Sequence, residues 1–141
     1  MPTNLYPRQF TDVVSMFQRA TIQTTDATVG VEMLIGGVSR ITIPDGKTWV
    51  FDVNIVARQV GGAGGALGNS AGYVLRGVLK RIGASTTLVG AQDKTVLAED
   101  DAAWDADAAA DDVNEALSLQ VTGAANQTIE WEAVVKITEV E

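Results

Sequence analysis

The feature that most constrains this chain is a strict alternation of apolar and polar residues with a period of two. Between Ile129 and Ile137 every odd-numbered position is apolar, and three of the four even-numbered positions are charged. Successive side chains of a β-strand point to opposite faces of a sheet, whereas a helix repeats its apolar positions every three to four residues. The segment therefore predicts a half-buried strand with Trp131 on its inner face.

The same alternation recurs upstream. Residues 48–58 predict a strand, whose partner is expected over residues 73–82. Residues 117–121 alternate as well, and the turn-forming residues 122–126 predict that they form a hairpin with 129–137. Shorter strand candidates are residues 20–28, 31–35, 40–43, 86–89 and 94–98.

Residues 99–112 contain seven carboxylates in fourteen positions. Trp104, Ala106 and Ala108 alternate with acidic residues, which favours a strand with small inward side chains; a helix is the competing interpretation, because Ala is the best helix former. The strand reading predicts an acidic outward face. Its members are Asp100, Asp101, Asp105, Asp107, Asp111 and Asp112.

Together these segments predict an all-β fold: an antiparallel β-sandwich or jelly roll of about eight to ten short strands over residues 20–141. The core is expected to include all three tryptophans, since each is in phase with its apolar neighbours. They are Trp49, Trp104 and Trp131.

Residues 1–19 follow a different pattern, and we expect them to form an N-terminal arm that contains a short helix. Four apolar residues recur at offsets of zero, three, four and seven, which is the spacing of one helix face. That face either packs on its own domain or reaches a neighbouring subunit, and we take it as the candidate partner-binding surface. Its residues are Phe10, Val13, Val14 and Phe17.

Composition excludes several classes of function. The chain has neither Cys nor His, so disulfides, thiolate or imidazole metal sites and a Ser-His-Asp triad are excluded. The net charge of −8 is uneven: residues 1–98 carry nine bases and six acids, and residues 99–141 carry one base and twelve acids. No cluster of Lys and Arg marks a nucleic-acid partner, and no apolar run of about 18 residues predicts a membrane helix.

Two segments invite a ligand-binding interpretation. The five glycines within residues 59–70 lack the Gly-Lys-Ser/Thr ending of a phosphate loop, so we expect an exposed, mobile loop. Asp105 and Asp107 could chelate a cation or act in a glycan hydrolase, but a solvated acidic face is favoured, and no cofactor is expected. The loop residues expected to be exposed are Gly61, Gly62, Gly64, Gly65, Leu67 and Asn69.

Four short motifs have the order and content of a known type of domain. They are IPDGKTWVFDV at 43–53, AGYVLRGV at 71–78, AEDDAAWD at 98–105 and LQVTG at 119–123. With the final Trp131 strand, residues 40–141 resemble a β-domain of tailed-bacteriophage virion structural proteins. The resemblance implies a non-enzymatic virion component that works as a homo-oligomer, often a trimer, and it carries over no catalytic residues.

Within that group, a β-domain behind a short arm, without a coiled-coil shaft or collagen-like repeat, looks like a capsid decoration or cement protein. Such a protein is made in the host cytoplasm and sits on the capsid surface, where it binds and stabilises the shell of major capsid protein. The alternative is a tail fibre or host-attachment module of the phage tail, for which the glycine-rich loop would be the contact surface.

Overall fold

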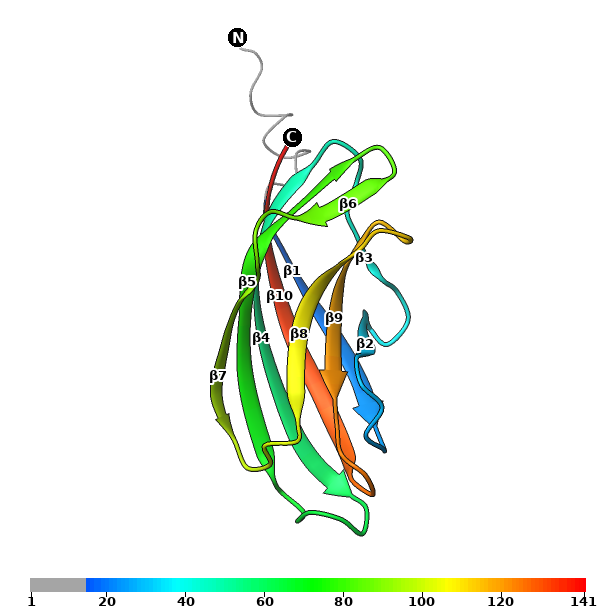
Figure 1. Cartoon of the computed structure of the whole chain (residues 1–141), viewed down its shortest axis with the longest axis vertical. Coiled ribbons are helices and arrows are strands. Elements are labelled where there is room, and N and C mark those ends of the chain that lie inside the picture. Colours follow the sequence, from blue (N-terminus) through cyan, green and yellow to red (C-terminus); the bar gives the residue numbers. More distant parts are fainter. Residues whose placement is uncertain (1–14) are drawn as a thin grey trace.

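The computed structural model describes residues 15–141, and it forms one curled antiparallel sheet of ten strands (Figure 1). The predicted all-β antiparallel fold is confirmed. The described residues contain no helix long and apolar enough to cross a membrane. The strands are β1 (Ser15–Thr24), β2 (Val31–Ile35), β3 (Ile41–Thr42), β4 (Thr48–Gly61), β5 (Ser70–Ile82), β6 (Ser85–Leu88), β7 (Asp93–Glu99), β8 (Asp105–Asp111), β9 (Ala116–Thr122) and β10 (Thr128–Val140).

The sheet curls so that its two ends approach each other as a half-barrel. β9 pairs with β8 along one edge and with β2 and β3 along the other. β2 leads to β1, and the sheet continues through β10 and β4 to β5, whose far edge is shared by β6 and β7. The curl places β8 and β9 in front of β4 and β10 (Figure 1). The two layers expected of a sandwich are therefore two halves of one sheet.

The predicted hairpin between residues 117–121 and 129–137 is wrong, although both segments are strands. β9 pairs with β2, β3 and β8, whereas β10 pairs with β1 and β4. The connection between them crosses from one half of the sheet to the other instead of reversing tightly. Gly123 makes this crossing possible, because a Cβ there would lie only 2.6 Å from Thr24 Oγ1. Alternation identifies a strand and its buried face, but it does not identify the neighbouring strand.

The core contains the three tryptophans, as predicted, and none is more than 2% exposed. Trp104 lies just before β8 in one half of the sheet, and its ring centroid is 5.9 Å from that of Trp131 in β10. Tyr73 of β5 stacks on Trp131 from another side at 6.3 Å. This aromatic cluster joins the two halves of the curled sheet.

Each buried indole N–H has an acceptor, which removes the cost of burying it. Trp49 donates to Glu139 at 2.8 Å, Trp104 to Gln127 at 2.8 Å and Trp131 to Thr24 at 2.9 Å. The tryptophans are therefore held in orientation as well as packed.

The structure describes the last five residues of the predicted N-terminal arm, and they form a strand instead of a helix. β1 begins at Ser15 and pairs with β10 from Ser15 opposite Thr138 to Thr24 opposite Ile129, so residues 15–19 belong to the sheet. Phe17 lies in this strand rather than in a helix, and it projects from the outer face, 69% exposed. A long partner strand offers these residues a full backbone ladder, which outweighs a helix of about two turns. Phe10, Val13 and Val14 lie outside the described residues.

Trp131→Ala is expected to lower the free energy of unfolding by about 3–5 kcal/mol, because it removes the ring that contacts both Tyr73 and Trp104. Chemical denaturation followed by circular dichroism measures the loss. Phe17→Ala, at an exposed position of the same sheet, is the control and should change stability little. Equal stability of the two variants would contradict the assigned inner face.

Candidate interaction surfaces

Two edge strands of the curled sheet, β7 and β8, are bridged by side chains. Lys94 of β7 donates from Nζ to Asp105 at 2.6 Å and to Asp107 at 3.1 Å, both on β8. Gln92 adds a second bridge: its Oε1 accepts from the backbone N of Ala108 at 2.7 Å, and its Nε2 donates to Asp107 at 2.7 Å. We call these contacts the edge bridge. The cation between the two aspartates is thus the chain's own lysine.

The edge bridge shifts the pKa of its members. Partial burial opposes the charged form of Lys94, but hydrogen bonds and charge from Asp105 and Asp107 outweigh burial and raise the pKa of Lys94. Burial likewise acts to raise the pKa of Asp105, and the hydrogen bond and charge of Lys94 overcome it, so that pKa is lowered. Both groups are therefore held in their charged forms.

The remaining acidic residues of the predicted face also meet donors of the same chain. At one end, Asp100 accepts from the backbone N of Ser70 at 2.8 Å. Asp101 accepts from Gln127 at 3.0 Å and from the backbone N of Ala103 at 2.9 Å, and these hydrogen bonds lower the pKa of Asp101.

At the other end, the turn after β8 is organised by two carboxylates. Asp111 accepts from the side chain and backbone N of Asn114, both at 2.9 Å, and these bonds lower its pKa. Asp112 accepts from the backbone N of Thr86 in β6 at 2.6 Å. The six aspartates therefore hold turns and edges together.

The glycine-rich loop between β4 and β5, residues 62–69, is tied to the neighbouring turn. Gly61 is the last residue of β4. Gly62 has a φ of +93°, and a Cβ there would collide with the backbone O of Asn126. The backbone N of Gly64 donates to the same oxygen at 2.8 Å. Only glycine permits this close approach of two backbones.

Gln59 holds the same loop from within. Its Nε2 donates to the backbone O of Gly61 at 3.0 Å and of Gly64 at 2.6 Å, and its backbone N donates to the backbone O of Asn69 at 2.8 Å. The base of the loop is thus held by hydrogen bonds to Gln59 and to the backbone of Asn126. Its tip carries Leu67, 71% exposed, while Gly62 and Gly65 are exposed beside it.

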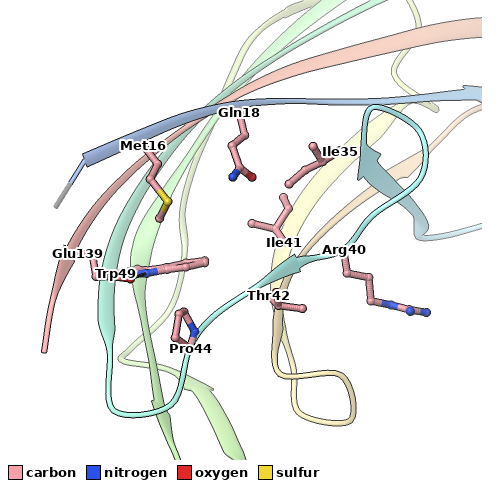
Figure 2. A pocket seen from close by; sticks show the side chains of 9 residues that line it. All are labelled: Met16, Gln18, Ile35, Arg40, Ile41, Thr42, Pro44, Trp49 and Glu139. Carbon is pink, nitrogen blue, oxygen red and sulfur yellow. Dashed lines mark hydrogen bonds between the residues drawn. The ribbon is translucent and has the colours of Figure 1, made fainter. Parts of the chain in front are cut away.

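A groove of about 260 Å³ opens at the opposite end of the sheet, between β1 and β3 (Figure 2). Apolar side chains from both strands and from the start of β4 form most of its wall. The Oε1 atom of Gln18 is buried there and has no hydrogen-bond partner among residues 15–141. The lining residues are Met16, Gln18, Ile35, Arg40, Ile41, Thr42, Pro44, Trp49 and Glu139.

The outer face of the sheet carries another depression, of about 350 Å³. Val56, Leu97 and Val134 lie around it on three different strands, and each is at least 45% exposed. Neither depression was predicted, because each depends on which strands become neighbours. The partners Lys94, Gln92 and Gln59 were missed for the same reason.

Residues 15–141 hold no group of three or more His, Cys, Asp or Glu residues that could bind a metal ion. The concave sites are mainly apolar, and the charged residues near them already have partners within the chain: Glu139 accepts from Trp49, and Arg40 lies 3.5 Å from Glu32.

No protein-family model matches the chain. No curated protein matches it either. Among solved structures, the chain is similar to the tailspike protein of Acinetobacter baumannii phage AM24, at 12% identity and a TM-score of 0.45. The similarity covers 88% of this chain and 26% of that one, so the chain spans about a quarter of the tailspike. A likeness this distant carries no argument about function.

Lys94→Met is expected to lower stability at neutral pH by about 1 kcal/mol, since solvent screens these partly exposed charges. The folded pKa of Asp105 is below its ordinary value of 3.8, so its contribution is present above that value and is lost as pH falls through the lowered pKa. The difference between the variant and the parent chain should therefore shrink in acid, as measured by urea denaturation across pH.

Lys80→Met is the matched control, because Lys80 is exposed and has no carboxylate within 4.0 Å among the described residues. A deficit for Lys94→Met that stays constant from neutral pH into strong acid would show that the lysine acts through packing alone.

Proposed function

We propose that the chain is a non-enzymatic structural module of a tailed-bacteriophage particle, acting by binding. The observation that carries this proposal is that three of the motifs behind the resemblance pack against one another in the core. The Gly72-Tyr73 strand, the Trp104 turn and the Trp131 strand are far apart in the sequence, yet their rings form one cluster. This supports the motifs as parts of one domain type rather than as chance matches.

The arrangement of the ends favours a tail-associated or host-attachment module. Ser15 and Glu141 lie at one end of the elongated sheet, and the loop of residues 62–69 lies at the other (Figure 1). A module attached to the particle by the first end would present the loop outward. The fixed base of that loop and its exposed Leu67 suit a contact surface, because a loop held in shape loses less entropy on binding.

A capsid decoration protein that binds the major capsid protein as a homo-oligomer is the second candidate. The exposed apolar residues of the outer face favour it, since Phe17, Val56 and Val134 offer a surface to a shell or a neighbour. The aspartates of residues 99–112 do not add to this case, because each has a donor within the chain.

Copy number in purified particles separates the two candidates. Quantitative mass spectrometry should find a few copies for each tail if the chain is a tail module, and hundreds of copies if it decorates the capsid. Antibody labelling of particles in electron micrographs gives the location independently. Complete absence from purified particles would contradict both candidates.

Leu67→Asp is expected to abolish binding to host cells while leaving the fold intact, because Leu67 is 71% exposed at the loop tip. The measurement is competition of the purified protein with particles for adsorption. Ile82→Asp, 69% exposed at the opposite end of β5, is the matched control and should compete like the parent chain. Undiminished competition by Leu67→Asp would exclude the loop tip as the contact.

A further inference from the structure

Among residues 15–141, the sheet has a gap between β1 and β3 that no strand fills. β1 pairs with β10 along its whole length, but on its other edge it pairs with β2 only at Ala20 and Thr21. The chain then turns away, and its last link to that edge is the bond from Gly36 N to Arg19 O at 3.2 Å. From Ser15 to Gln18, no described strand pairs with this edge of β1.

The opposite side of the gap is also open. β3 pairs with β9 through Ile41 and Thr42, and no other described strand pairs with it. β1 and β3 thus present unpaired edges on the two sides of the groove in Figure 2. Unpaired edges of this kind accept an additional strand through backbone hydrogen bonds.

The inside of the groove suits an extended peptide. Trp49, Met16 and Ile41 supply an apolar floor and walls for a side chain. The buried Oε1 of Gln18 has no donor within residues 15–141, and a backbone N–H of an inserted strand is a donor of the right kind. The groove can therefore bind both an apolar side chain and the backbone of a peptide.

We propose that residues 1–14 of a second copy of this chain bind in the groove as an added strand. Fourteen residues precede Ser15, and Ser15 is next to Met16 in the groove wall. These fourteen residues include five apolar side chains able to fill it. They are Leu5, Tyr6, Phe10, Val13 and Val14.

A second copy fits better than the same copy. To lie beside its own β1, the chain would have to reverse within residues 11–14, which read Thr-Asp-Val-Val. Tight hairpin turns favour Gly, Asn and Asp, of which this segment has Asp12 alone, and its β-branched valines oppose them. A segment from another copy enters without this turn, and mutual exchange would build a closed oligomer.

Disulfide trapping tests the proposal, because the chain has no Cys of its own. Full-length Thr42→Cys, at an exposed position of the groove, is mixed under mild oxidation with full-length Phe10→Cys and, separately, with Val13→Cys. We expect a mixed disulfide dimer on a non-reducing gel. Its yield should exceed the control by on the order of tenfold, since docking raises the effective concentration towards the millimolar range.

Leu67→Cys replaces Thr42→Cys in the control mixture, since Leu67 is also exposed but lies at the other end of the sheet. A chain carrying both Phe10→Cys and Thr42→Cys tests whether residues 1–14 bind instead in the groove of their own chain, since the disulfide would then form within one monomer. Mixed dimers no more abundant than in the control would overturn the proposal. A disulfide that forms only within the doubly substituted monomer would overturn it in favour of the chain's own segment.

Discussion

The half-barrel is closed by side chains that join two edge strands, β7 and β8, without pairing their backbones. β7 and β8 approach each other, and Lys94 and Gln92 span the distance to Asp105, Asp107 and the backbone N of Ala108. An open strand edge invites pairing with other chains. Side chains that occupy the edge close the half-barrel and protect it at once.

The carboxylates of residues 99–112 take part in this closure, whereas the gap between β1 and β3 stays open among the described residues. The carboxylates of residues 99–112 accept hydrogen bonds that join edges and hold turns. The gap between β1 and β3 has no comparable bridge among the described residues, and the acceptor of Gln18 is unsatisfied there. Side chains of the chain itself therefore close the space between β7 and β8, and the gap between β1 and β3 suits a partner.

Period-two alternation predicted what depends on a single strand. It identified 31–35 with the bounds of β2, and it assigned Trp49, Trp104 and Trp131 to the core. It did not predict which strands become neighbours, so the hairpin of 117–121 with 129–137 was wrong. The helix expected through Phe17 failed because the polar Gln18 points inward and hides the alternation of β1. Lys94 and Gln92 carry no local signal, since their partners are defined only by the curl of the sheet.

Hydrogen exchange at the backbone N–H of Ala108, followed by NMR, tests the edge closure most directly. In the parent chain this amide donates to Gln92 Oε1, so it should exchange slowly despite lying in an edge strand. Gln92→Ala should make it exchange rapidly, while the amide of Trp131 in β10 remains protected. Rapid exchange at Ala108 in the parent chain, equal to that in Gln92→Ala, would contradict closure of the half-barrel by side chains.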